Sequence, residues 1–182
     1  MGSEEGEVRE VTWILAVILT CCAGWTDTRA RKIPNWLTIS GLVVGIVVNS
    51  AGSGWRGTLF SLEGAAVPLL LLLPPVLMRG LGAGDWKLMG SLGAILGIER
   101  VLAVLLATIV LAGIVAVFLM IKQRRVIVTL KNMWEILRGV FVFGVRPNPE
   151  ISLDNPNATS LPFGVMAGLA TVLCYCAGAL RS

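Results

Sequence analysis

The chain of 182 residues contains no histidine. This absence excludes Ser-His-Asp and Cys-His nucleophile systems, the metalloprotease helix with two histidines and the usual haem ligand. The four cysteines form two close pairs and lack the twinned Cys-x-x-Cys spacing of a zinc site: Cys21 with Cys22, and Cys174 with Cys176. We interpret them as small core residues. We therefore expect neither a metal nor a cofactor, and any hydrolysis must use other side chains.

Charge is also scarce, because only 14% of the residues are charged while 55% are hydrophobic. Soluble domains have about 25% charged residues. A membrane-spanning helix needs about 20 mostly apolar residues. Six stretches carry no charge: Val11 to Thr26, Ile33 to Trp55, Gly64 to Met78, Leu88 to Ile98, Val101 to Ile121, and Asn155 to Leu180. The sequence therefore predicts an all-α integral membrane protein with six transmembrane helices.

Two of these stretches are short for a bilayer. We expect the first helix to continue through Thr26 and Asp27, and a fourth helix of spanning length to include Asp85 and Lys87 in its first turn. Glycines four residues apart, as at Gly41 and Gly45, indicate close helix packing.

Basic residues predict the orientation, because Lys and Arg are enriched in cytoplasmic connections. Of the 15 Lys and Arg residues, eleven fall in the three connections on one side and four on the side of the termini. Both termini are therefore expected outside. The predicted organisation is a short extracytoplasmic N-terminus over residues 1–10 and one six-helix domain over residues 11–180. That domain includes a long cytoplasmic connection, residues 122–160.

The first half of this connection has helical periodicity. Its apolar positions recur at steps of three and four residues, with basic residues on a neighbouring side: Ile127, Leu130, Trp134, Leu137 and Phe141, with Arg124, Lys131 and Arg138. The pattern predicts an amphipathic helix lying on anionic headgroups. A substrate-docking role is the alternative.

Carboxylates at a membrane edge indicate function, because they are costly there. Glu63 and Glu99 fall near the outer ends of spans, where water reaches them, whereas Asp27 and Asp85 fall at the predicted cytoplasmic boundary. Two carboxylates that share a site cannot both ionise easily, so that one of them holds a proton. Such a pair can hydrolyse a peptide without histidine or metal.

Each aspartate stands in a recognisable block. Asp27 is followed six residues later by Ile33-Pro34-Asn35, and the other block reads Gly82-Ala-Gly84-Asp85-Trp-Lys87. Helix packing would explain the glycines alone, and an interface anchor would explain Lys87 alone. Together, and in this order, the blocks resemble those of type IV prepilin peptidases, the bacterial Gly-x-Gly-Asp membrane aspartyl proteases. Leu161-Pro162-Phe-Gly164 is similar to a third, looser family feature.

The resemblance implies six helices with catalytic Asp27 and Asp85 at the cytoplasmic face of a bacterial inner membrane. It also implies a prepilin or pseudopilin substrate with a basic leader, cut after glycine. The residues expected to bind substrate or shape the site are Gly82, Gly84, Lys87, Pro34, Asn35, Pro162 and Gly164. Only ten residues precede the first span, without the Cys-x-x-Cys segment linked to N-methylation in larger members. The chain therefore looks more like the short peptidases of tight-adherence pilus systems, and methylation is doubtful.

Two other readings stay open. In one, the chain is a small transporter or channel-like protein whose Asp27 and Asp85 relay protons or bind a cation. In the other, it is a catalytically silent relative that scaffolds a pilus assembly. The expected partners are the precursor and the anionic lipid bilayer, with no nucleic acid, and the pattern indicates no particular oligomeric state.

Overall fold

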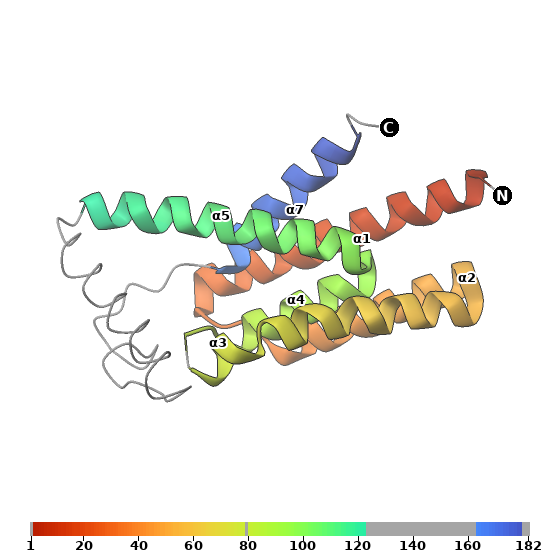
Figure 1. The fold of residues 1–182 in the computed structure, drawn as a ribbon, viewed down its shortest axis with the longest axis horizontal. Helices are drawn as coiled ribbons and strands as arrows, with labels where there is room; N and C mark the ends of the chain where they lie inside the picture. The colour runs from red at the N-terminus through yellow and green to blue at the C-terminus, as the bar shows by residue number, and fades with distance from the viewer. Residues whose placement is uncertain (1, 79, 123–162, 180–182) are drawn as a thin grey trace.

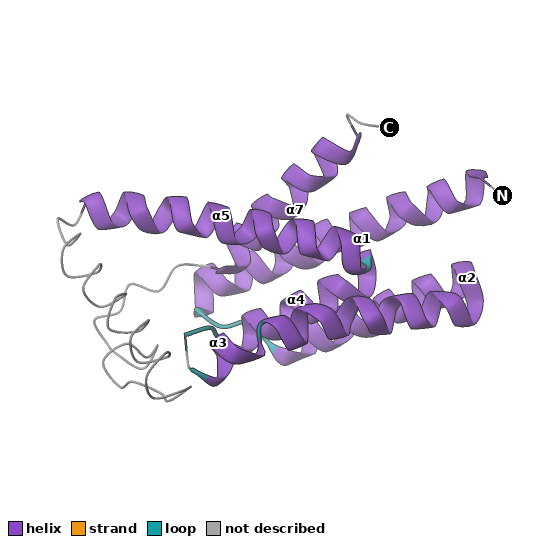
Figure 2. Cartoon of the chain, in the orientation of Figure 1, coloured by secondary structure: helices purple, strands orange, loops and turns teal. Residues whose placement is uncertain are grey.

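The computed structural model describes residues 2–78, 80–122 and 163–179, and these residues form helices without strands (Figures 1 and 2). The helices are α1 (Gly2–Ala30), α2 (Asn35–Leu71), α3 (Leu73–Leu77), α4 (Ala83–Leu96), α5 (Ile98–Lys122) and α7 (Phe163–Ala179). The predicted amphipathic helix lies outside the described residues, as does Pro162.

Helix α1 extends at both ends beyond the first charge-free stretch. It begins at Gly2 and not at Val11, because the glutamates between these positions are good helix formers. It continues through Thr26 and Asp27, as predicted. It ends at Ala30, where Arg31 takes a left-handed conformation (φ 50°) and donates its N–H to the Asp27 carbonyl at 2.8 Å.

Helix α2 is folded into a hairpin. Gly54 has φ 58° and ψ −138°, a conformation that favours glycine, and the chain reverses there. Two side-chain hydrogen bonds join the arms: Asn49 Nδ2 donates to Ser61 Oγ at 2.9 Å, and the Ser50 and Thr58 hydroxyls lie 2.7 Å apart. The first arm, residues 35–53, corresponds to the second predicted span, whereas the second arm, residues 55–71, overlaps the third predicted span only over residues 64–71.

Helix α4 occupies the core. Every residue from Leu88 to Leu96 is buried, because the helix packs against both arms of α2. Glycines permit this approach: an added Cβ at Gly45 would lie 2.8 Å from the backbone of Ala94, and one at Gly64 would clash with the Gly93 carbonyl. The expected packing role of Gly45 is thus confirmed. Only Gly97, with φ 78°, separates α4 from α5.

Helix α7 packs on α1 and α5. In Figure 1, α1 begins and α7 ends toward the same end of the molecule, whereas α1 ends and α4 and α7 begin toward the opposite end. This arrangement brings three helix termini together around Asp27 and Asp85.

The outer surface is apolar, as in a membrane protein. Three helices are long and apolar enough to cross a bilayer: residues 8–30 of α1, α2, and residues 98–119 of α5; α7 is a shorter apolar helix. The interpretation of the cysteines as core residues is wrong for three of them. Cys21, Cys22 and Cys176 are exposed, because they lie on the outward faces of α1 and α7.

Candidate functional site

Asp27 lies in the last turns of α1 and contacts α7. Its Oδ2 accepts a hydrogen bond of 3.0 Å from the backbone N–H of Gly164, in the first turn of α7. Two residues 137 positions apart in the sequence therefore meet at the site. Sequence analysis singled out both of them, and the structure brings them together.

Asp85 lies in the first turn of α4, before the apolar segment that begins at Leu88 and outside the three helices long enough to cross a membrane. Burial and the negative charge of Asp27 raise the pKa of Asp85 to about 7, and a hydrogen bond from the Gly82 backbone opposes the increase. Gly82 is the N-cap residue of α4, and an added Cβ there would lie 2.9 Å from Asp85 Oδ2. The Asp85 carboxyl group thus folds back over Gly82, and the charge of Asp27 acts on it.

The loop between α1 and α2 lies on the start of α4. An added Cβ at Gly84 would stand 3.2 Å from Ile33 Cβ and 3.3 Å from the Ile33 carbonyl oxygen. The two motifs therefore pack directly against each other because Gly84 has no side chain. Pro34 is the N-cap residue of α2, with φ −70° and ψ 141°. It directs the chain so that Asn35 opens α2 beside α4.

Asn35 and Lys87 also meet. Lys87 Nζ donates to Asn35 Oδ1 at 3.0 Å, which joins the Ile-Pro-Asn block to the Gly-x-Gly-Asp block. The predicted site residues within the described ranges therefore fall into two connected sets: Asp27 with Gly164, and Gly82, Gly84, Asp85 and Lys87 with Pro34 and Asn35. Ile33, which follows Asp27 in the first block, lies against Gly84 and so brings the two sets together.

Two anchors of α4 were missed from the sequence. Trp86 Nε1 donates to the Leu69 carbonyl of α2 at 2.7 Å, and Ser91 Oγ donates to the Thr38 carbonyl at 2.5 Å. Trp86 holds the first turn of α4 against α2, and Ser91 holds the middle of the helix, so that together they fix the direction in which Asp85 lies. Trp86 stands inside the motif itself, but nothing in the sequence pattern pointed to its partner.

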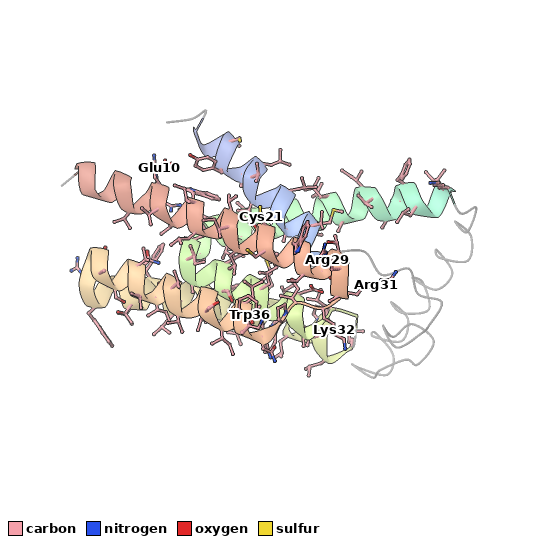
Figure 3. All side chains as sticks on the ribbon, turned by 180° about the vertical axis from the view of Figure 1, so that it is seen from behind. Glu10, Cys21, Arg29, Arg31, Lys32 and Trp36 are labelled. Atoms are coloured by element: carbon pink, nitrogen blue, oxygen red, sulfur yellow. The ribbon has the colours of Figure 1, made fainter. Side chains whose placement is uncertain are left out.

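The two glutamates singled out in the sequence lie away from the two aspartates, whereas three basic residues lie near the end of α1. Glu63 and Glu99 are exposed, and Glu99 lies in the first turn of α5, beyond the opposite end of α4. Figure 3 shows Arg29, Arg31 and Lys32 gathered near the end of α1, with Glu10 toward its other end. Among the residues that the structure describes, no three Asp, Glu or Cys side chains cluster as metal ligands would.

The chemistry of the site is that of two unlike carboxyl groups at the meeting point of three helices. A family model described as the type IV leader peptidase family matches residues 13–117. The chain belongs to the type IV leader peptidase family. The match includes Asp27 and Asp85 and ends before α7. No curated protein and no solved structure gave a significant match.

Membership of the leader peptidase family identifies a protease-like protein of the membrane, with prepilins as the general class of substrate. The resemblance seen in the two sequence blocks is thereby confirmed at the level of the family.

Proposed function

We propose that this leader peptidase is an aspartyl endopeptidase of the membrane that removes the basic leader of prepilin-like precursors, cutting after glycine, with Asp27 and Asp85 as its catalytic residues. The observation that supports the proposal is the contact between the two family-like blocks, because Ile33, which follows Asp27 in the first block, lies against Gly84, the neighbour of Asp85 in the second. Both lie within the segment that the family model matches.

The reaction needs one ionised and one protonated carboxyl group. The ionised group takes a proton from water while the water oxygen attacks the peptide carbonyl carbon, and the protonated group gives its proton to the carbonyl oxygen. The tetrahedral diol then collapses. The first carboxyl group passes its proton to the leaving nitrogen as the C–N bond breaks, and the second recovers a proton from a diol hydroxyl. Both groups end in their starting states.

The topology proposed for the chain has six crossings, formed by α1, the two arms of α2, α4, α5 and α7. The basic ends near Arg31 and Lys87 face the cytoplasm and both termini lie outside. Residues 11–180 then form one peptidase domain, and residues 1–10 form a short extracytoplasmic part. Residues 122–160 are its cytoplasmic connection, resting on anionic lipid of the bacterial inner membrane.

The precursor approaches from the cytoplasmic side, where Gly82 and Gly84 allow Asp85 and Ile33 to lie close to the start of α4. Lys87, Pro34 and Asn35 shape this side of the site, and Pro162 and Gly164 shape the side of α7.

Co-expression with a candidate prepilin tests the proposal. Leader removal is followed by gel mobility and N-terminal sequencing for the parent chain, Asp27→Asn and Asp85→Asn, with Glu99→Gln as the matched control. We expect the parent and Glu99→Gln to cleave after glycine, and each aspartate variant to lose at least about a thousandfold in rate, because a missing carboxyl group stops proton transfer.

Cleavage that persists in either aspartate variant, with normal membrane insertion, would contradict the two-aspartate mechanism. An intact precursor with the parent chain across several pilins would count against the peptidase. A proteoliposome flux of protons or cations that requires Asp27 and Asp85 would then favour the transporter.

A further inference from the structure

The first turn of α7 reaches the carboxylate of Asp27 with a backbone group. Gly164 is the second residue of α7, is buried, and donates its N–H to Asp27 Oδ2 at 3.0 Å. The first amides of a helix have no acceptor within the helix and carry partial positive charge. The N–H of Gly164 therefore finds its acceptor in the Asp27 carboxylate and fixes the position of that side chain.

This approach requires a glycine. An added Cβ at Gly164 would lie 3.1 Å from the carbonyl carbon and oxygen of Ala23 and 3.2 Å from the Gly24 nitrogen. All three are backbone atoms of α1, so no side chain can rotate to make room. Gly168, one turn further along α7, differs: its added Cβ would stand 3.6 Å from the Thr20 carbonyl oxygen, an ordinary contact.

The surroundings of Asp85 favour its protonated form. Its carboxyl group is largely buried and faces the negative charge of Asp27, and its backbone donor is Gly82, on its own helix. The two carboxyl groups of the site are thus held by different elements, Asp27 by α7 and Asp85 by α4.

We propose that Gly164 is a positioning residue whose backbone N–H orients the Asp27 carboxylate as the base toward the attacking water, which leaves Asp85 as the proton donor. This assignment rests on the proposed peptidase function and deepens it. In the first step Asp27 takes the proton of the attacking water and Asp85 gives its proton to the carbonyl oxygen. In the second step Asp27 gives its proton to the leaving nitrogen, and Asp85 recovers one from the diol.

Among the residues that the structure describes, the other charged groups near the end of α1 are already engaged or exposed. On α1, the Arg29 guanidinium lies 4.6 Å from the centre of the Trp25 ring, and on α4, Lys87 bonds Asn35. Arg31 and Lys32, in the following loop, are exposed. The described residues of α7 include no Asp, Glu, Lys or Arg, so that α7 acts on Asp27 through its backbone.

Infrared spectroscopy tests the assignment without substrate. The purified full chain is measured in detergent at a pH about two units below 7, where a carboxyl group with the pKa of Asp85 is about 99% protonated. We expect the carbonyl band of a buried protonated carboxyl group to vanish in Asp85→Asn and to remain in Asp27→Asn and Glu99→Gln. A band that vanishes in Asp27→Asn and remains in Asp85→Asn would overturn the proposal.

Cleavage by Gly164→Ala and Gly168→Ala tests the positioning role, because both variants add one methyl group to α7. We expect Gly168→Ala to keep the parent rate and Gly164→Ala to lose about tenfold or more. We also expect the loss to fall on kcat while KM stays near the parent value, since the added methyl group displaces a carboxylate that acts in the chemical step. A parent-like rate, or a loss carried by KM alone, would contradict the role of Gly164.

The two experiments distinguish a failure of the proposed function from a failure of the roles assigned to Gly164, Asp27 and Asp85. If the parent chain cleaves no prepilin, the proposed function fails, while the infrared bands still decide which aspartate holds the proton. If Gly164→Ala does not fold, as judged by gel filtration, the infrared comparison of the two aspartate variants decides.

Discussion

At the scale of the residue, the site depends on glycines, because their lack of a side chain lets neighbouring segments approach closely. Gly84 allows Ile33 to rest on the first turn of α4, where an added Cβ would stand 3.2 Å from Ile33 Cβ and 3.3 Å from its carbonyl oxygen. Gly80 belongs to the same glycine-rich stretch, yet its added Cβ would lie 3.6 Å from the nearest atom, the Pro75 carbonyl oxygen. The two glycines therefore differ in function although they look alike in sequence.

We predict that Gly84→Ala lowers prepilin cleavage about tenfold, because the loop before α2 must shift by a few tenths of an ångström and carries Asn35 away from Lys87. Gly80→Ala serves as the matched control and should cleave at the parent rate. The measurement is the initial rate of leader removal by purified variants at equal concentration. Equal rates for both variants would show that contact with Ile33 does not shape the site.

At the scale of the element, α4 is held at its far end by a single amide. Asn49 Nδ2, from the first arm of α2, lies 3.0 Å from the Ala94 carbonyl oxygen and 3.3 Å from that of Ile95. Helix α4 ends at Leu96, so these carbonyls belong to its last turn, where no N–H group of the same helix is available to bond them. Asn49 also bonds Ser61 on the second arm and thus joins three helical segments.

We predict that Asn49→Leu lowers the free energy of unfolding by about 1–2 kcal/mol, because Ser61 and the α4 carbonyls lose a buried partner. The melting temperature in detergent should fall by several degrees. Ser40→Leu is the control, since the Ser40 hydroxyl bonds only the Leu37 carbonyl of its own helix. A melting temperature unchanged in Asn49→Leu, or lowered equally in both variants, would count against this network.

At the scale of the whole molecule, the sequence predicted the helices better than their contacts. Charge-free stretches mark several helices well, because a bilayer disfavours unpaired charge, and α1, the first arm of α2, α4 and α5 follow them. The second arm of α2 does not, since it contains Arg56 and Glu63. Asn49 was overlooked because the criterion was charge, and Asn is polar without charge. The N-terminal extension of α1 was missed because acidic residues end an apolar stretch without ending a helix.

The site could be predicted in part for a similar reason. The two blocks point to Asp27 and Asp85 by their local pattern, and the order of helices places both at one end. The bond from Gly164 to Asp27 depends on how α7 crosses α1, and a crossing geometry leaves no pattern in one sequence. Trp86 and Leu69 illustrate the same limit, because one partner of their bond is a backbone carbonyl.

The proposed orientation of the whole chain gives the last prediction. The turn at Gly54 and the loop that holds Lys32 lie at opposite ends of the first arm of α2, so they should face opposite sides of the membrane. We predict that Ser53→Cys reacts with a membrane-impermeant maleimide in intact cells, whereas Lys32→Cys reacts only after the cells are opened, because basic connections stay in the cytoplasm. Both changes are made in a background with alanine at Cys21, Cys22, Cys174 and Cys176. Labelling of Lys32→Cys in intact cells would invert the topology and place Asp27 and Asp85 on the outer face, where a cytoplasmic precursor could not reach them.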